Sequence, residues 1–223
     1  MQQEAPARKL FGSQEPTHLI TPPDVAYSDL EAVLDLAQVI GITLDPWQIS
    51  FFEHALGRRI DEEGRSKWAA FNVVIELSRQ NGKSILLELR ALAGVFAFGE
   101  ESVVYTAHDG KTVMNAFRRL VQIIETTPAL KRRVQKMTSG NGKEAIYLRD
   151  PADPNNRYKH GGVITFRTRT ADGGRGLTGD CVIIDEAQDA TDDHTGALLP
   201  MMAARTEQGD PQIWYCPSTT RWS

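Results

Sequence analysis

The sequence predicts an α/β fold with a mainly parallel β-sheet that is covered by helices on both faces. Apolar segments typical of buried strands alternate with helical segments between residues 71 and 216. A Gly-Lys-Ser triplet at residues 82–84 lies between one of these strands and the following helix. The 223 residues include 41% hydrophobic and 24% charged residues, which is typical of a globular protein and excludes a disordered chain.

The N-terminal part is expected to consist of an extended arm followed by two helices. Residues 1–27 form the arm because they contain four scattered prolines, Pro6, Pro16, Pro22 and Pro23. The helices are predicted over Ser28–Ile40 and Pro46–Leu56. The second helix has clear boundary signals: Asp45 as N-cap, Pro46 at the first helical position, and Gly57 just past the end. Residues 28–223 are then expected to form one domain.

The remaining elements make up the strand–helix alternation. The predicted strands are Phe71–Glu76, Ser102–Ala107, Ala145–Leu148, Val163–Thr168, Cys181–Asp185 and Gln212–Cys216. The predicted helices are Lys83–Phe98, Lys111–Thr126 and His194–Arg205. The helix that starts at residue 83 is apolar on most faces but carries charges, so we expect it to be buried in the protein instead of crossing a membrane. Because no helix follows the last strand, we expect the chain to be a fragment of a longer protein.

The distribution of charge and the cysteines narrow the class of protein. The net charge of −4 argues against a nucleic-acid partner, but residues 111–175 hold 14 Lys and Arg against five Asp and Glu. The densest basic cluster predicts a surface for DNA phosphates, with an ordinary solvated face as the alternative; it comprises Lys131, Arg132, Arg133 and Lys136. Cys181 and Cys216 lie in apolar runs and are expected to be buried, reduced thiols, as in a cytosolic protein.

The segment around the Gly-Lys-Ser triplet predicts a phosphate-binding loop. A loop between a strand and a helix directs backbone N–H groups and the helix N-terminus at phosphates. Its candidate nucleotide-binding residues are Ser78, Arg79, Gln80, Asn81, Gly82, Lys83 and Ser84. Lys83 would contact the β- and γ-phosphates, and the Ser84 hydroxyl would bind Mg²⁺. The consensus expects glycine at position 77, where Leu77 stands, so a solvated turn that caps a helix remains the alternative.

A second motif supports this interpretation. The apolar strand Cys181–Asp185 ends in two consecutive carboxylates, Asp185 and Glu186, about 100 residues after the loop. Asp185 would bind the Mg²⁺ shell, and Glu186 would polarise water for attack on the γ-phosphate. Two surface acids at the end of a strand are the alternative, but the presence of both motifs in one α/β alternation favours a nucleotide hydrolase.

These motifs resemble the N-terminal ATPase domain of the large terminase subunit of tailed bacteriophages. The resemblance covers roughly residues 40–222. It is carried by an arginine-containing loop at 79–84 without the first glycine, Asp45-Pro46-Trp47-Gln48, Asp185-Glu186-Ala187-Gln188, and Pro217-Ser218-Thr219-Thr220. It implies a P-loop NTPase of the additional-strand, catalytic-glutamate (RecA-like) type. Such a protein would hydrolyse ATP with Mg²⁺ and package double-stranded DNA into a procapsid.

The resemblance also implies roles for individual residues. Gln48 would bind the adenine edge, and Arg79 would act in cis on the γ-phosphate, where charge develops during phosphoryl transfer. Arg175, with Arg169 as second candidate, would act in trans on a neighbouring subunit. Ser218, Thr219 and Thr220 would couple loss of the γ-phosphate to movement of DNA. The alternatives are an aromatic core face for the helix of Gln48, a solvated arginine in a glycine-rich turn, and an ordinary Ser/Thr turn.

The family further implies a set of partners and a location. These are double-stranded DNA, a portal protein, a small terminase subunit and further copies of the chain in a ring, a pentamer, with no membrane partner. The location is the host cytoplasm during virion assembly. The nuclease domain that forms the second half of the proteins in this family is expected to be absent here, so we expect no DNA cleavage. A superfamily 2-like helicase and a nucleotide-binding domain that does not turn over remain alternative classes.

Overall fold

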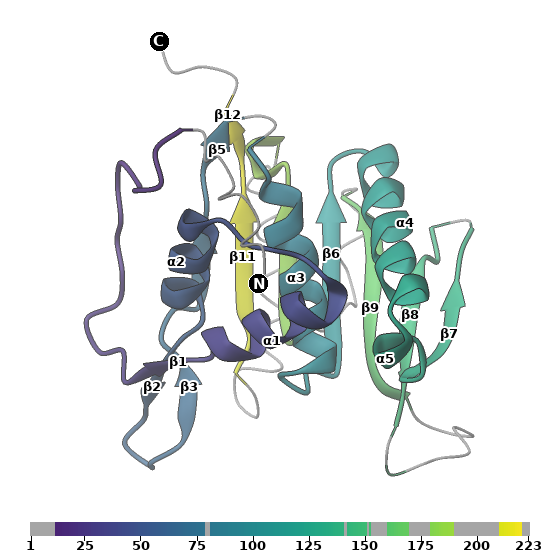
Figure 1. Cartoon of the computed structure of the whole chain (residues 1–223), viewed down its shortest axis with the longest axis horizontal. Helices are drawn as coiled ribbons and strands as arrows, with labels where there is room; N and C mark the ends of the chain where they lie inside the picture. The colour runs from purple at the N-terminus through teal and green to yellow at the C-terminus, as the bar shows by residue number, and fades with distance from the viewer. Residues whose placement is uncertain are drawn as a thin grey trace, which may run out of the picture.

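A seven-stranded mixed sheet forms the centre of the molecule (Figure 1). The computed structural model describes residues 12–78, 81–140, 142–150, 152, 160–169, 179–189 and 210–219. In sheet order the strands are β4 (Asn72–Val74), β11 (Gln212–Cys216), β10 (Cys181–Asp185), β6 (Ser102–Ala107), β9 (His160–Thr168), β8 (Ala145–Arg149) and β7 (Val134–Thr138). The first five strands are parallel, and β8 and β7 continue the sheet in antiparallel pairs.

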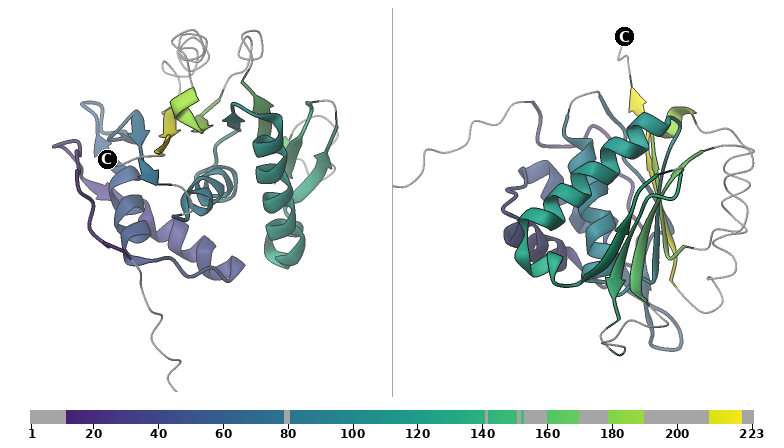
Figure 2. Two further views of the ribbon diagram at one scale, coloured as in Figure 1. Left: turned by 90° about the horizontal axis from the view of Figure 1, so that it is seen from above. Right: turned by 90° about the vertical axis from the view of Figure 1, so that its right-hand side faces the viewer.

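Five described helices pack on one face of this sheet (Figure 2). They are α1 (Leu30–Ile40), α2 (Pro46–Ala55), α3 (Lys83–Phe96), α4 (Gly110–Thr126) and the single turn α5 (Pro128–Lys131). Helix α3 is buried at every position from Leu86 to Phe96, as its apolar sequence predicts. Helix α4 buries one side only, with Val113, Phe117, Leu120 and Ile124 at helical spacing. Among the described helices, none is long and apolar enough to cross a membrane.

The order of the parallel strands confirms the predicted α/β fold class with a mainly parallel sheet, whereas the described α-helices lie on one face of this sheet and not on both faces as predicted. Strand β11 lies between β4, which leads to the Gly-Lys-Ser loop, and β10, which ends in the two carboxylates. This inserted strand is the additional strand of the RecA-like arrangement. Strands β6, β10 and β11 have the bounds that the sequence predicts, and helices α1 to α4 end within two residues of their predicted bounds. The helix predicted over His194–Arg205 lies outside the described residues.

The structure contains a second, smaller sheet that the sequence did not predict. It consists of β1 (Tyr27–Ser28), β2 (Gly57–Ile60) and β3 (Ser66–Trp68), which pair antiparallel. Residues 61–65 form the hairpin turn between β2 and β3. The charged residues of these strands obscure an apolar–polar alternation in the sequence. In the structure, Arg58 packs its guanidinium over the Trp68 ring at 3.2 Å and pairs with Asp29 and Asp210. Long-range ion pairs therefore connect this sheet to residues far away in the chain.

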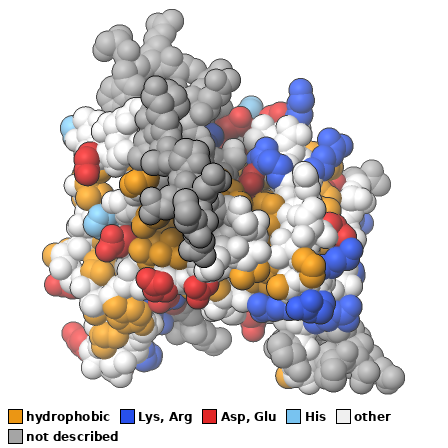
Figure 3. All heavy atoms as spheres, in the orientation of Figure 1, with side chains coloured by type: hydrophobic (Ala, Val, Ile, Leu, Met, Phe, Trp, Pro, Cys, Tyr) orange, Lys and Arg blue, Asp and Glu red, His pale blue; other side chains and the backbone are white. Residues whose placement is uncertain are grey.

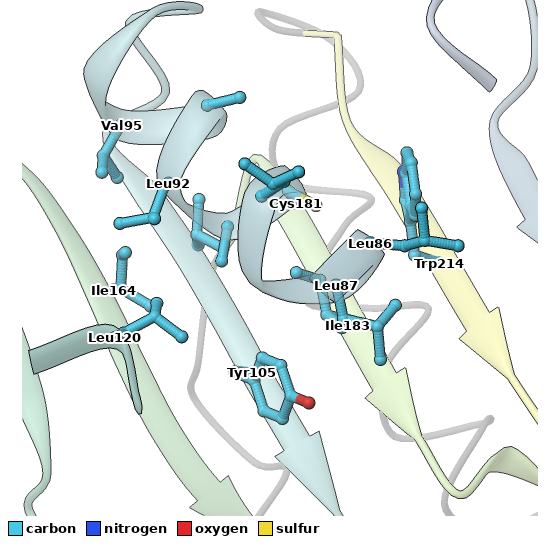
Figure 4. Packing of buried hydrophobic residues seen from close by; sticks show 14 of the residues in the cluster. Leu86, Leu87, Leu92, Val95, Tyr105, Leu120, Ile164, Cys181, Ile183 and Trp214 are labelled. Atoms are coloured by element: carbon cyan, nitrogen blue, oxygen red, sulfur yellow. The ribbon is translucent and has the colours of Figure 1, made fainter. Parts of the chain in front are cut away.

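The hydrophobic core lies between α3 and the parallel strands (Figure 4). The apolar side chains of α3 meet Tyr105, Ile183 and Trp214 from the neighbouring strands β6, β10 and β11. The alternate residues of the same strands form a second cluster on the opposite face, comprising Val104, Val182, Ile184 and Ile213. Both cysteines are buried free thiols, which confirms the prediction for them.

A buried ion pair anchors the C-terminal half of α3. The guanidinium of Arg90 is fully buried and donates to both carboxylate oxygens of Glu100, at 2.6 and 2.9 Å. The rings of Trp68, Phe98 and Trp214 surround it, with centroids 5.4–5.6 Å from the guanidinium carbon. A bidentate pair of this kind satisfies two charges that would otherwise be costly to bury.

Candidate nucleotide-binding and hydrolysis site

The described residues predicted to bind nucleotide lie around the carboxyl ends of the parallel strands, at the upper edge of the sheet in Figure 1. The chain passes from β4 through the short strand β5 (Leu77–Ser78) to the loop that precedes α3. Strand β10 ends there in Asp185, and α4 begins there after β6. Open α/β sheets bind ligands at this edge, because the loops that follow the strands leave a crevice.

Lys83 and Asp185 form the centre of the site. The Lys83 ammonium nitrogen lies 3.0 Å from one carboxylate oxygen of Asp185, and both side chains are largely buried. The other carboxylate oxygen accepts a hydrogen bond from the Tyr105 hydroxyl at 2.9 Å. Burial raises the pKa of Tyr105 well above its usual value, so the phenol stays protonated and keeps donating. The carboxylate of Asp185 is therefore fixed between a cation and a neutral donor.

Gly82 is required by the backbone of the loop. It caps α3 with φ of +77°, a left-handed conformation that favours glycine. A side chain at this position would also approach α2, because an added Cβ would lie 3.3 Å from Nε2 of Gln48 and 3.9 Å from Trp47. The loop and the start of α2 are therefore in close proximity, as the predicted adenine-binding role of Gln48 requires.

The side chain of Gln48 is oriented by a capping box at the start of α2. Its Oε1 accepts a hydrogen bond from the Asp45 backbone N–H at 2.8 Å, while the Asp45 side chain caps the helix in return. This bond directs the Nε2 group of Gln48 toward Gly82. The side chain is buried, so its amide is held at the edge of the loop by the start signal of its own helix.

Glu186 occupies a strained turn directly after β10. Its φ is +54°, and among the described residues it is the one non-glycine with positive φ. A conformation of this kind costs roughly 1–3 kcal/mol and is typical of functional sites. The Glu186 backbone N–H donates to Asp185 Oδ1 at 2.9 Å, and the Thr112 hydroxyl lies 3.5 Å from Glu186 Oε1. The turn therefore sends the two adjacent carboxylates in different directions, one toward Lys83 and one toward α4.

Arg169 holds the same turn from the other side. Its guanidinium donates to the carbonyl oxygens of Asp185 at 2.7 Å and Glu186 at 2.8 Å, and it lies 3.5 Å from the carbonyl oxygen of Thr106. The sequence suggested this arginine only as second candidate for a role in trans. Its contacts with the backbone of its own chain favour another role.

A buried carboxylate connects α3 with α4 behind the site. Glu88 of α3 forms an ion pair with Arg119 of α4. Burial raises the pKa of Glu88; Arg119 opposes this shift, and the charge of Asp185 adds to it. Sequence reasoning missed Glu88, Tyr105 and Thr112. The available signal was a phenol and a carboxylate in otherwise apolar buried segments, since each needs a partner there.

The structure describes most, but not all, of the predicted loop and coupling residues. Ser78 and Asn81 are joined by a side-chain hydrogen bond, and Ser84 follows Lys83 in the first turn of α3. The short strand β12 (Ser218–Thr219) pairs in parallel with β5, so the predicted coupling segment lies beside the start of the loop. Four predicted residues lie outside the described part of the chain: Arg79, Gln80, Arg175 and Thr220. The described residues contain no group of three or more His, Cys, Asp or Glu that could hold a metal.

The predicted DNA-binding residues lie far from this site. Lysine and arginine side chains gather over the part of the molecule formed by α4, α5 and β7 (Figure 3). All four predicted residues are exposed there, but three of them have partners. Lys131 pairs with Glu125, Arg133 donates to the Phe96 carbonyl oxygen at 2.7 Å, and Lys136 lies 4.6 Å from the centroid of the Tyr147 ring. Helix α4 runs from the site to this cluster, a distance of about 25 Å for its length.

Comparisons with known proteins identify structural relatives of the chain. The large terminase of bacteriophage HK97 is similar with a TM-score of 0.65 and 18% identity, over 85% of this chain and 38% of that protein. The large terminase ATPase domain of Thermus phage P74-26 gives a TM-score of 0.58 and 19% identity, over 92% of this chain and 73% of that domain. No family model and no curated protein matches the sequence. The chain spans less than two fifths of the HK97 protein, and it has the fold of the ATPase domain of phage large terminases.

Proposed function

We propose that the chain is the ATPase domain of a phage large terminase and that it hydrolyses ATP to move double-stranded DNA into a procapsid. The observation that carries this proposal is the meeting of Lys83 with Asp185, next to Glu186 on its strained turn, at the carboxyl edge of the sheet. The solved terminase structures supply the matching fold.

The described residues fit a nucleoside triphosphate. Backbone N–H groups at the start of α3 and the Lys83 ammonium group offer positive charge to phosphates. Gln48 stands beside the loop, where the adenine would bind. Glu186 follows Asp185 on the same turn, and its carboxylate would accept the proton of a water that attacks the γ-phosphate. Arg79 would add positive charge in cis.

The oxygen donors of the site fit Mg²⁺ as well. Ser84 and Asp185 provide a hydroxyl and a carboxylate, and Mg²⁺ at such sites takes few protein ligands because phosphate oxygens and water complete its shell. When bound, the ion neutralises charge on the phosphates. The protein's own contribution is to hold Asp185 in one orientation through Tyr105 and Lys83.

The partners of the complete protein belong to the same proposal. DNA would contact the basic cluster at α5 and β7 through its phosphates. A portal protein, a small terminase subunit and further copies of the chain, with Arg175 acting on the neighbouring site, would complete a pentameric ring in the host cytoplasm. Ser218, Thr219 and Thr220 would link the nucleotide state to the grip on DNA, since β12 lies beside β5.

Lys83→Ala tests the nucleotide site. We expect the affinity for ATP to fall about 10- to 100-fold, because a charge-assisted hydrogen bond of about 1.5–3 kcal/mol is lost. Binding is measured by titration calorimetry, and hydrolysis by phosphate release. The control is Lys143→Ala, an exposed lysine in the hairpin between β7 and β8, which should bind ATP like the wild type. If the Lys83 variant binds ATP with the same affinity as the wild type and the Lys143 variant, the proposed phosphate site is wrong.

Salt dependence tests the proposed DNA surface. The triple variant Lys131→Ala/Arg132→Ala/Lys136→Ala leaves out Arg133, which has a packing role. We expect the slope of log affinity against log salt to become shallower by about 2 to 3, since each phosphate contact contributes roughly 0.9. Binding to duplex DNA is followed by fluorescence anisotropy at several salt concentrations. The control is Arg59→Ala, which replaces an exposed arginine of the small sheet. An equal change of the salt slope in the triple variant and in this control would mean that DNA binds elsewhere.

A further inference from the structure

We infer that Arg169 is a positioning residue that holds the Asp185–Glu186 turn within its own subunit. The inference rests on the proposed ATPase function and deepens it, because it names the group that fixes the geometry of the general base. It assigns Arg169 to the site of its own chain and not to that of a neighbour.

The place of Arg169 in the sheet allows one side chain to span three strands. The residue follows β9, and its backbone N–H donates to the Ala107 carbonyl oxygen at 2.9 Å, which continues the pairing with β6. From there the guanidinium crosses the end of β6, passing the Thr106 carbonyl oxygen at 3.5 Å, and reaches the end of β10. It donates from Nη1 to Asp185 and from Nη2 to Glu186.

The contacts fall on the one strained turn that the described residues contain outside glycine. Glu186 has a left-handed backbone, a conformation that persists only where the surroundings impose it. The carbonyl oxygens on both sides of this residue accept hydrogen bonds from the same guanidinium, at 2.7 and 2.8 Å. Two hydrogen-bonded carbonyl oxygens, one on either side of a single residue, restrain its φ and ψ. The orientation of the Glu186 carboxylate is therefore coupled to Arg169.

Holding two carbonyl oxygens at once requires the planar, fork-shaped guanidinium of arginine. Its two terminal nitrogens donate in parallel to two acceptors, whereas a lysine presents a compact charge on a flexible stem. Both terminal nitrogens of Arg169 point at the backbone of its own chain. A residue that reaches the nucleotide of a neighbouring subunit would have to present those same nitrogens to a phosphate.

The experiment compares steady-state ATP hydrolysis of wild type, Arg169→Ala and Arg169→Lys in the complete chain. We expect kcat of Arg169→Ala to fall about 10²-fold, the effect of displacing a catalytic group by about 1 Å. KM and the affinity for ATP should stay within about threefold, because Lys83 and the loop are intact. Arg169→Lys should recover only part of kcat, since it restores the charge without the fork.

The control is Arg167→Ala, two residues earlier on β9. Its guanidinium donates to the carbonyl oxygens of Gly142 and Phe166, away from the turn, so kcat should be close to that of the wild type. Thermal unfolding of every variant separates folding from catalysis. If Arg169→Ala does not fold, Arg169→Lys decides: a lowered kcat with unchanged KM supports the inference, and a wild-type kcat overturns it.

A trans role gives a different result, which mixing reveals. Arg169→Ala subunits carry an intact Glu186, and Glu186→Gln subunits carry an intact Arg169. Recovery of hydrolysis on mixing them would show that Arg169 acts across the interface and would overturn the inference, whereas additive residual rates support it. Absence of ATP hydrolysis by the wild type would remove the proposed function and this inference together. Normal wild-type hydrolysis with normal Arg169 variants would remove only the inference.

Discussion

Replacement of Glu186 by glutamine should lower kcat for ATP hydrolysis about 10²- to 10⁴-fold, the usual contribution of a general base. Glutamine has the same shape, so the hydrogen bond between its backbone N–H and Asp185 is retained. The amide lacks the basicity to accept a proton from the attacking water. ATP binding should remain, because the substitution leaves the proposed phosphate contacts, Lys83 and the start of α3, unchanged.

The measurement pairs single-turnover hydrolysis with direct ATP binding. Glu53→Gln, an exposed glutamate of α2, serves as the control and should hydrolyse ATP like the wild type. Loss of ATP binding in the Glu186 variant would instead indicate a role in ground-state affinity. Hydrolysis at the wild-type rate would exclude Glu186 as the base and leave the chain among nucleotide-binding domains of another mechanism.

Glu100→Ala should destabilise the protein by about 3–5 kcal/mol, the cost of removing one partner from a buried ion pair. Arg90 is fully buried between three aromatic rings, and the carboxylate of Glu100 accepts two hydrogen bonds from it. Without Glu100 the guanidinium charge would remain in the core with little compensation. Urea unfolding, followed by the fluorescence of the buried tryptophans, measures the change.

The neighbouring residue provides a matched control for this prediction. Glu101→Ala removes an exposed carboxylate one position later and should change the unfolding free energy by less than about 1 kcal/mol. The double variant Arg90→Met/Glu100→Leu should be more stable than Glu100→Ala, because it removes both charges together. Equal stability of Glu100→Ala and wild type would mean that Arg90 finds another partner in the core.

The local patterns of the sequence predicted the central sheet well. The strands over 102–107, 181–185 and 212–216 and the buried helix α3 follow from continuous apolar runs that alternate with helical segments. These patterns can be recognised locally, because residues that are close together in the sequence form the same strand or helix. The small sheet of β1, β2 and β3 was not predicted, since its Arg58 pairs with Asp29 and Asp210, which lie far away in the chain.

The residues of the candidate site likewise fall into those that local sequence patterns predicted and those that they did not. The loop at Gly82 and Lys83 and the carboxylates Asp185 and Glu186 could be found from residue types and spacing, and the structure brings Lys83 and Asp185 into contact. Glu88 and Tyr105 offered only the weak signal of a polar group in an apolar segment, and Arg169 had no local signature of its contacts. Arg169 was predicted only as second candidate for a role in trans, and its carbonyl partners depend on the order of the strands in the sheet.

The pairing of β12 with β5 has a consequence for how such proteins diverge. This link between the segment that follows β11 and the start of the loop is made by peptide groups in parallel register, Ser218 opposite Leu77 and Thr219 opposite Ser78. Peptide groups are the same for almost every residue type, and only proline lacks the donor. A physical connection of this kind persists through extensive sequence drift. Chains that share this fold can thus keep the same connection between strand and loop while losing any recognisable motif at that position.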